Sequence, residues 1–414
     1  NCSETHYKAV QTRLTKFVQS GRLGPFANAY WGNPSYKLPA EANLIILSHY
    51  LDALQVSKLG AQMMAIFGGK NPHPQTLVVG GVTSVMDAMD ASRLGEYLFR
   101  LKELNNFVDT AYIPDVLLAA TYYKGEGAAG IGAGVPNYLA YGGFPQDDDW
   151  NRLLFPRGII KGRDLSKVLP IDEARITEEA THAWYRGSKP EHPYVGTTEP
   201  EYTGYNSRGN LAGQEKYSWC KAPRYDGQPY EVGPLARVLV AYASGNEEIK
   251  GLVDGTLKTL GIPATALFST LGRTAARALE TKYVGSHIAG WINELVANQK
   301  AGDTRFWTPC NVPEKGEGRG LTEPPRGALG HWIRIDNRVI ANYQAVVPST
   351  WNCSPRDKAG NRGPYEESLV GTRLANVDQP LEILRTIHSF DPCMACAVHI
   401  IDPKSDRIRE FRIA

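Results

Sequence analysis

The sequence feature that most constrains the fold is a long run with helical periodicity, PAEANLIILSHYLDALQVSKLGAQMMAIFGG, which starts at Pro39. Proline is favoured in the first turn of a helix, and the Gly68–Gly69 pair supplies a typical stop signal. The run therefore predicts one long helix. It also indicates that the first third of the chain is mainly helical.

Helical periodicity returns in two further regions of the chain. One run covers about residues 90–123, and amphipathic stretches fill about 232–300. A short helix is predicted for LEILRTIH, residues 381–388. Between the main helical regions, residues 124–230 are rich in Gly, Pro and Tyr without a sustained period, which predicts loops with small sheets.

Strand signals are short and lie mostly near the C-terminus. HWIRIDNRVIANYQAVV contains two alternating runs around a DNR turn, and VHIIDPKSDRIREFRI has the same character, so each predicts a hairpin. GGKNPHPQTLVVGGVTS is rich in turn residues and predicts an ordered loop. No internal repeat or linker is evident. We therefore expect a single mainly α (α+β) domain over residues 1–414, with a long-helix core and small peripheral β-hairpins.

Composition excludes several classes of protein. A chain of 414 residues with 42% hydrophobic content can bury a core without disulfides, and six cysteines are too few for a disulfide framework. The net charge of +2 gives no basic stripe for nucleic acid, and no apolar run approaches the roughly 20 residues of a membrane span. The start, NCSETHYKAV, has neither Met nor a signal-peptide core, so we expect an incomplete chain.

The stretch SFDPCMACAVH contains Cys393 and Cys396, the only close pair of cysteines. Thiols at this spacing can bind one soft metal ion or form a redox dithiol. A structural zinc would need two more ligands, and no second CxxC or matching histidine pair exists. A thioredoxin-type dithiol would open a helix after a strand, whereas this pair follows a helix. From these residues alone, two buried structural cysteines remain a third interpretation.

Other blocks of sequence carry a resemblance to a known family. DPCMACAVH resembles the C-terminal signature of the large, catalytic subunit of nickel–iron hydrogenases. Similar matches, in the same order, are KAPRYDGQPYEVGPLARVL (221–239), TEPPRGALGHW (322–332) and VVPSTWNCSPRD (346–357), with FGGKNPHPQ and LGPFANAYWGNPSYKLPAEANL nearer the start. The resemblance covers nearly the whole chain. It implies the hydrogenase large-subunit fold and reversible oxidation of dihydrogen at a nickel–iron centre held by four cysteine thiolates.

The resemblance implies a set of metal ligands. Cys393 corresponds to a terminal nickel ligand, at the position that a related subclass fills with selenocysteine, and Cys396 to a thiolate that bridges nickel and iron. Thiolates suit both metals because they are soft donors. His399 resembles a magnesium ligand, with the backbone carbonyl of Ala345 as a second one. A lone histidine after an apolar pair is otherwise a satisfied core residue.

The resemblance also implies the residues around the open side of the metals. Arg326 corresponds to an arginine above the open coordination position, Pro325 shapes that pocket, and Asp391 orients the arginine. The family's iron carries cyanide and carbon monoxide ligands, and Ser349, beside Pro348, corresponds to a hydrogen-bond donor to cyanide. The competing interpretation is that the Arg-Gly pair and the serine only form turns.

The chain departs from the family pattern at its start. The family's N-terminal Arg-x-Cys-Gly-x-Cys motif has no counterpart, since Cys2 stands alone, so this chain by itself is expected to be inactive. We assign no role to His73, His287, Tyr30 or Asp226. The remaining cysteines are predicted to be buried hydrophobic residues: Cys220, Cys310 and Cys353.

The family also implies processing and partners. Its large subunit is made with a C-terminal extension, which would here be residues 400–414, removed by a maturation endopeptidase after nickel-insertion factors have acted. Electrons would pass to an iron–sulfur small subunit. The mature enzyme would be periplasmic and attached to the membrane through that subunit or a further anchor, and its precursor cytoplasmic. The alternatives are an inactive precursor or assembly intermediate and a non-catalytic, hydrogenase-like respiratory subunit.

Overall fold

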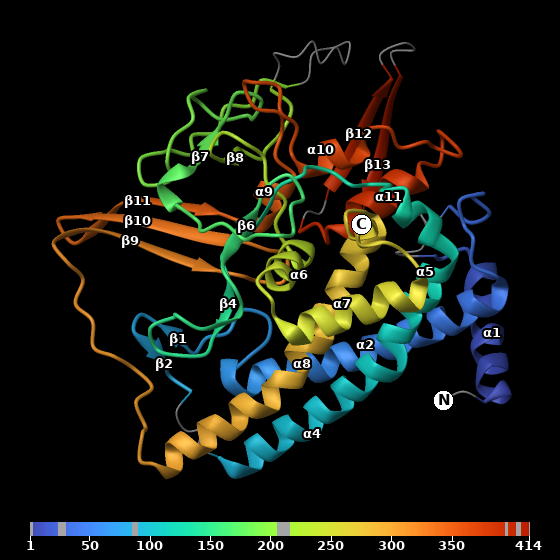
Figure 1. Cartoon of the computed structure of the whole chain (residues 1–414), viewed down its shortest axis with the longest axis horizontal. Coiled ribbons are helices and arrows are strands. Elements are labelled where there is room, and N and C mark those ends of the chain that lie inside the picture. The colour runs from blue at the N-terminus through green and yellow to red at the C-terminus, as the bar shows by residue number, and fades with distance from the viewer. Residues whose placement is uncertain are drawn as a thin grey trace. The chain divides into compact units, whose positions relative to one another are not determined.

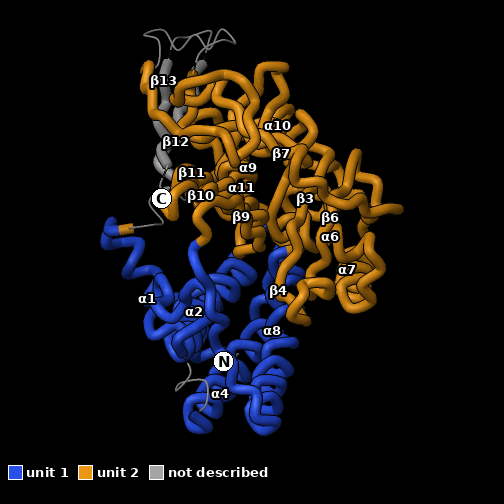
Figure 2. Tube along the Cα trace, turned by 90° about the vertical axis from the view of Figure 1, so that its left-hand side faces the viewer, with its two compact units in different colours: residues 1–22, 38–122, 277–312 blue, residues 23–37, 123–276, 313–414 orange. Residues whose placement is uncertain are grey.

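The computed structural model describes residues 3–23, 30–84, 90–204 and 216–393, together with the backbone of 396–402 and 407–413. The chain divides into two compact units (Figure 2). Unit 1 comprises residues 1–22, 38–122 and 277–312, and unit 2 comprises 23–37, 123–276 and 313–414. The prediction of one domain over 1–414 is not tested by this division and stays a prediction.

Unit 1 is built from long helices. Helices α1 (Glu4–Gln19), α2 (Ala40–Gly68) and α4 (Ala91–Phe107) belong to it, and α2 lies against both α1 and α4 (Figure 1). The expected limits of α2 are confirmed, because Pro39 precedes its first residue and Gly69 ends it in the left-handed region at φ 74°.

Helix α4 continues through a π-helical turn, Val108–Tyr112, into α5 (Ile113–Ala128). The helical run predicted over about 90–123 is therefore confirmed, with one π-helical turn inside it. The GGKNPHPQ region was predicted as an ordered loop, but it is followed by a small hairpin. Its strands, β1 (Leu77–Val78) and β2 (Gly81–Val82), have two residues each. Among the described residues, no helix is both long and apolar enough to cross a membrane.

Unit 2 contains many short elements. Three antiparallel pairs fill the loop-rich region, as predicted: β3 (Tyr138–Ala140) with β6 (Gly158–Ile160), β4 (Gly143–Pro145) with β5 (Leu153–Phe155), and β7 (Ile176–Glu179) with β8 (Ala222–Tyr225). The helices that follow are α6 (Pro234–Ala243), α7 (Glu247–Leu260) and α8 (Thr270–Lys300), which continues into unit 1.

A three-stranded antiparallel sheet forms the largest β element. The predicted hairpin is present as β10 (Leu329–Asp336) and β11 (Val339–Val346), and a third strand that was not expected, β9 (Lys315–Thr322), pairs with β10. Figure 1 shows the three strands running together.

The last part of the chain combines short helices with the predicted terminal hairpin. Helices α9 (Pro348–Asn352), α10 (Pro364–Leu369) and α11 (Leu381–Ser389) are followed by β12 (Cys396–Asp402) and β13 (Arg407–Ile413). The backbone register of that hairpin sets Cys396 opposite Ile413 and His399 opposite Glu410.

The core of unit 2 joins the sheet to the sequence blocks identified above. Trp332 of β10 and Trp351 of α9 are each only 1% exposed and belong to one apolar cluster with Tyr225 of β8 and Val232. Burial of aromatic side chains of this size stabilises the fold by roughly 2–3 kcal/mol each. The cluster therefore packs together residues from several of the sequence blocks identified above.

Candidate metal centre

The DPC segment begins where α11 ends. Phe390 caps the helix, and Asp391 takes a left-handed conformation at φ 55° while its N–H donates to the carbonyl of His388 (2.9 Å). Aspartate tolerates this conformation better than most non-glycine residues, and Pro392 cannot continue the helix. Local sequence therefore turns the chain sharply just before Cys393.

Arg326 lies against this turn. Its Nε donates to the backbone carbonyl of Asp391 (2.8 Å), and its Nη2 lies 3.3 Å from the Asp391 carboxylate. Both side chains keep part of their surface exposed, 37% for Arg326 and 42% for Asp391. The arginine is thus oriented by two groups of one residue and still faces solvent.

Ser349 contacts the same turn from a different element. It lies in the first turn of α9, behind Pro348 at the first helical position, and its hydroxyl accepts the backbone N–H of Cys393 (3.3 Å). Ser349 is 9% exposed, whereas Cys393 is an exposed thiol outside any disulfide. Residues from three separate sequence blocks therefore meet within two positions of Cys393.

The loop that carries Arg326 is fixed by helix α6. Arg237 donates to the carbonyls of Pro324 (3.1 Å) and Pro325 (2.7 Å), and forms a buried ion pair with Glu323 (2.7 Å). Arg237 is 1% exposed and the Glu323 side chain 0%. Three acceptors at the start of the loop therefore converge on one guanidinium, which sets the direction in which the backbone enters Arg326.

Two glycines allow this loop to approach the start of α6. Gly327 has φ 131°, and a Cβ there would lie 2.5 Å from the backbone nitrogen of Gly233. Gly233 has φ 124°, and its Cβ would lie 3.0 Å from the carbonyl oxygen of Arg326. A side chain at either position would push the two segments apart. Glycine is needed at both for steric reasons.

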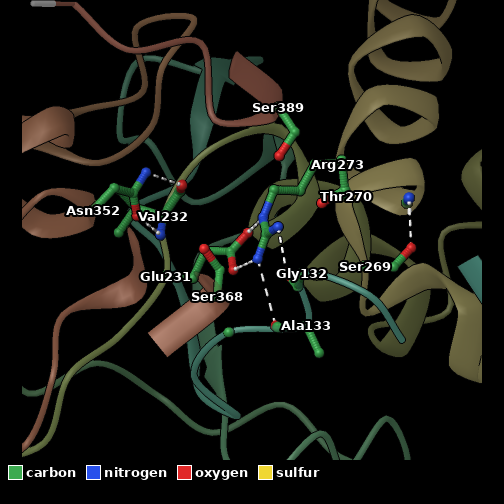
Figure 3. Close-up of polar contacts among 12 residues, drawn as sticks. Gly132, Ala133, Glu231, Val232, Ser269, Thr270, Arg273, Asn352, Ser368 and Ser389 are labelled. Atoms are coloured by element: carbon green, nitrogen blue, oxygen red, sulfur yellow. Dashed lines mark hydrogen bonds and ion pairs between the residues drawn. The ribbon is translucent and has the colours of Figure 1, made fainter. Parts of the chain in front are cut away.

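A second buried arginine supports Asp391 from the helix side. Figure 3 shows Arg273 of α8 pointing at Glu231, with which it forms two hydrogen bonds (2.7 and 2.8 Å), and at the carbonyl of Gly132 (2.7 Å). The guanidinium carbon lies 3.8 Å from the ring centroid of Phe390, in a cation–π contact. Because Phe390 precedes Asp391, this contact anchors the end of α11.

Helix α9 is tied to the same region by its last residue. The Asn352 amide donates to the carbonyl of Val232 (2.9 Å) and accepts its N–H (3.1 Å), as Figure 3 shows. Asn352 is 2% exposed. The Asn352 side chain thus pairs with the Val232 backbone as an adjacent strand would. Because Ser349 lies in the same short helix as Asn352, these two bonds also fix Ser349 relative to the Val232–Gly233 segment.

Buried charges also lie along the KAPRY block, which consists of Lys221 and strand β8. Lys221 lies 3.9 Å from Glu178 of β7, with both side chains largely buried. Burial raises the pKa of the Glu178 carboxyl to about 7 against the attraction of Lys221, and burial lowers the pKa of Lys221. Three positions further along, Arg224 donates to Asp357 (2.7 Å), which ties β8 to the segment after α9.

The other predicted site residues are placed less closely. Pro325 is exposed beside Arg326, Pro348 is buried, and exposed Ala345 pairs with His331 in the sheet. The backbone of Cys396 and His399 lies in β12, but their side chains lie outside the described residues. Within the described residues, no group of three or more His, Cys, Asp or Glu could hold a metal ion.

The donor that is described fits a late transition metal. Cys393 has an exposed sulfur with no disulfide partner, and its backbone N–H is bound by Ser349. The cationic side chain of Arg326 contacts Asp391, two residues before Cys393. Soft thiolates are the donors that nickel and iron accept in proteins. Of the two cysteines predicted as metal ligands, Cys393 is the one whose side chain the structure describes.

The prediction that the other cysteines are buried hydrophobic residues is wrong for Cys310, which is exposed. Cys220 and Cys353 are half-buried and their sulfur atoms lie 2.8 Å apart. The sequence could not reveal this contact because 133 positions separate the two residues.

Sequence reasoning also missed the residues that support the site. The sequence blocks at 221–239 and 346–357 contain three such residues, to which the sequence assigned no role: Arg237, Gly233 and Asn352. A signal was present: an arginine in the middle of an otherwise apolar helix, PLARVLVAYA, needs a buried acceptor.

Comparisons with known proteins identify the family. The family model for nickel-dependent hydrogenases matches residues 1–399. The chain is 49% identical to the quinone-reactive Ni/Fe-hydrogenase large chain of Wolinella succinogenes, over 98% of this chain and 72% of that protein. It is 48% identical to the uptake hydrogenase large subunit of Rhizobium leguminosarum bv. viciae, over 99% of this chain and 74% of that protein.

A solved structure shows the same fold. The Ni-Fe-Se hydrogenase from D. vulgaris Hildenborough superposes with a TM-score of 0.75 at 36% identity, covering 86% of this chain and 71% of that one. The predicted mainly α (α+β) hydrogenase fold is confirmed. A large subunit implies a smaller partner, and the family implies nickel and iron as cofactor metals. The chain belongs to the nickel-dependent hydrogenase family, as a large, catalytic subunit that oxidises dihydrogen.

Proposed function

We propose that the turn at residues 391–393 is the protein side of the hydrogen-splitting site, with Cys393 and Cys396 as thiolate ligands of nickel and iron. The observation that carries this proposal is the meeting of Arg326, Ser349 and Cys393 at the end of α11. A bound nickel–iron centre supplies the position at which dihydrogen is split and its electrons are taken up. No observation favours the inactive or non-catalytic alternatives.

Arg326 supplies a fixed positive charge beside that position. A guanidinium has five N–H donors, and the contacts with Asp391 use two of them. The remaining donors can face a small ligand or a developing charge. Because Asp391 holds the guanidinium in place before any reaction, little reorganisation is needed during turnover. Asp391 is thus a positioning residue for Arg326.

Cys393 has a second role in the proposal. A thiolate sulfur can bind a metal and can also accept a proton, since thiols ionise within a few pH units of neutrality. The proton released from dihydrogen would then be held at the Cys393 sulfur, next to the Arg326 guanidinium. The exposure of Cys393 gives that proton a route to solvent.

Ser349 is proposed to bind a ligand of the iron. Its oxygen accepts the N–H of Cys393 through a lone pair, so its own O–H can still donate. A cyanide ligand on iron needs such a donor, and carbon monoxide does not. The same hydroxyl would therefore fix the Cys393 backbone and discriminate between the two diatomic ligands.

The finer metal and processing assignments concern the end of the chain. We propose that His399 and the Ala345 carbonyl bind magnesium, and that residues 400–414 are removed after nickel insertion by a maturation endopeptidase. The family match ends at His399. The backbone of β13 pairs with that of β12, which contains Cys396 and His399, so removal of the tail would free this strand to move.

Electron transfer requires a partner. We propose an iron–sulfur small subunit, and a quinone as the final acceptor because the relative from Wolinella succinogenes is named quinone-reactive. A periplasmic, membrane-associated mature enzyme is part of the same proposal. Fractionation of cells that express the complex, with immunodetection of this chain, tests the location.

The experiment that tests the site is Arg326→Lys in the complete enzyme. Lysine keeps the charge but cannot donate in a planar fork to both groups of Asp391, so hydrogen-dependent dye reduction per nickel should fall roughly a hundredfold or more. Arg334→Lys is the matched control, because Arg334 is exposed on β10 and should keep full activity. Equal activity of the two variants would show that Arg326 takes no part in the reaction.

A further inference from the structure

Two cysteines outside the candidate metal centre are in direct contact. Cys220 lies just before β8 and Cys353 caps the end of α9, and their sulfur atoms are 2.8 Å apart. That separation is shorter than the contact distance of two sulfur atoms that merely pack together, and a disulfide bond is about 2.05 Å long. A small closing movement would bond them.

The side chain of Arg224 holds the two cysteine-bearing segments together. Arg224, four residues after Cys220, donates to the Ser354 hydroxyl (3.1 Å) and to the Pro355 carbonyl (3.1 Å), directly after Cys353. Arg224 is 3% exposed and Ser354 is 0% exposed. The two thiols are thus kept together by contacts that do not involve sulfur, which gives a high effective concentration of one thiol at the other.

The chemical surroundings favour reaction of Cys220. Its backbone N–H donates to the Ser218 hydroxyl (3.0 Å), and hydrogen bonds with Cys353 and then Ser218 lower the pKa of the Cys220 thiol. A thiolate is the reactive form of cysteine. Both residues are half-buried, so a small molecule can reach them.

We propose that Cys220 and Cys353 form a reversible disulfide, a redox modification site separate from the metal centre. The oxidant is a small disulfide of the glutathione class. The bond would connect β8 directly to α9, the helix that presents Ser349 to Cys393.

The reaction proceeds by thiol–disulfide exchange. The Cys220 thiolate attacks one sulfur of the small disulfide, forming a mixed disulfide and releasing one small thiolate. The Cys353 sulfur then attacks the Cys220 sulfur, forming the protein disulfide and releasing the second thiolate. The two protein thiols lose two electrons and two protons, and the small disulfide takes up both as two thiols.

The disulfide would be a covalent cross-link between two segments 133 positions apart in the chain. Closing a loop of that length restricts the unfolded chain more than it restricts the folded one, because the sulfurs already touch in the fold. The oxidised protein should therefore unfold at a higher urea concentration than the reduced protein. The change involves no residue of the metal centre.

The test uses the purified complex of full-length subunits in buffers with increasing ratios of oxidised to reduced glutathione. After alkylation, non-reducing peptide mapping by mass spectrometry should find one peptide pair linked through Cys220 and Cys353, two hydrogen atoms lighter than the reduced pair. Reduced glutathione should reverse the link. Two alkylated thiols at the highest ratio, or separate glutathione adducts on both cysteines, would overturn the proposal.

Variants separate the pair from other cysteines. In Cys353→Ser, Cys220 should be trapped as a single glutathione adduct, and the difference in urea midpoint between oxidised and reduced protein should vanish. Cys310→Ser is the matched control, since Cys310 is an exposed cysteine in unit 1, and it should keep both the link and the midpoint difference. If the midpoint difference survived in Cys353→Ser, another cysteine would cause it, and the proposed Cys220–Cys353 disulfide would be refuted.

Discussion

Replacement of Arg237 by methionine should destabilise unit 2 strongly and disturb the site from a distance. Methionine occupies a similar volume and suits a helix, so packing and helix propensity change little. The loss is electrostatic. Glu323, whose side chain is 0% exposed, would keep the N–H of Tyr141 as a donor (2.6 Å) but lose its ion-pair partner.

The magnitude follows from the burial of the pair. Breaking a fully buried ion pair from one side costs about 3–5 kcal/mol. The carbonyls of Pro324 and Pro325 also lose their donor, but these effects overlap because one guanidinium serves all three acceptors. We therefore expect a total of about 3–5 kcal/mol, a large part of the 5–15 kcal/mol that stabilises an ordinary domain.

Urea unfolding of the purified chain, followed by circular dichroism, measures this loss. Arg334→Met, at an exposed position on β10, is the control and should change the unfolding free energy by less than about 0.5 kcal/mol. Adding Glu323→Gln to Arg237→Met neutralises the orphaned carboxylate and should recover about 1–2 kcal/mol. A loss below about 1 kcal/mol in Arg237→Met, or no recovery in the double variant, would refute the assigned role of the pair.

Three further outcomes are expected. Cys396→Ser should leave the purified enzyme without a full complement of nickel and iron by elemental analysis, because a hydroxyl is a harder and less acidic donor than a thiol; full metal content would contradict its role as a bridging ligand. Glu178 has a folded-state pKa of about 7 against about 4.5 when unfolded, so the unfolded protein releases its proton first and stability falls by up to about 3 kcal/mol as the pH rises from 4.5 to 7. Glu178→Gln should flatten that part of the pH profile of urea unfolding, and an unchanged profile would contradict the assignment. Mass spectrometry of the nickel-replete enzyme should show a chain ending at His399, and an intact tail on active enzyme would rule out its removal.

The sequence predicted elements well where one pattern dominated. Helix α2 has a proline before its start and a glycine pair at its end, and the β10–β11 hairpin has two β-prone runs on either side of a polar turn. Strand β9 was missed because KGEGRGLT contains three glycines and little apolar surface, and it is held by its pairing with β10 rather than by intrinsic preference. Helix α1 was missed for a related reason, since its cap by Ser3 is clear but few of its residues are buried.

The sequence predicted which blocks contain site residues, but not how those blocks are arranged in space. Resemblance pointed to Arg326, Asp391 and Ser349, but gave no distances, and the structure places all three around Cys393. Cys396 and His399 remain untested because their side chains lie outside the described residues. Spatial relations between blocks could not be read from the chain, because no local pattern encodes which buried arginine meets which carbonyl.

Steric and electrostatic requirements explain why those blocks depend on one another. Gly233 and Gly327 must both lack a side chain for the Arg326 loop to approach α6, and Arg237 must then donate hydrogen bonds to the carbonyls of Pro324 and Pro325 at the start of that loop. A change in one block therefore displaces the other, and Arg326 moves with its backbone even when no metal ligand has been altered. Substitutions at either glycine should for this reason resemble a loss of Arg326 in activity while leaving the thiolates of the centre in place.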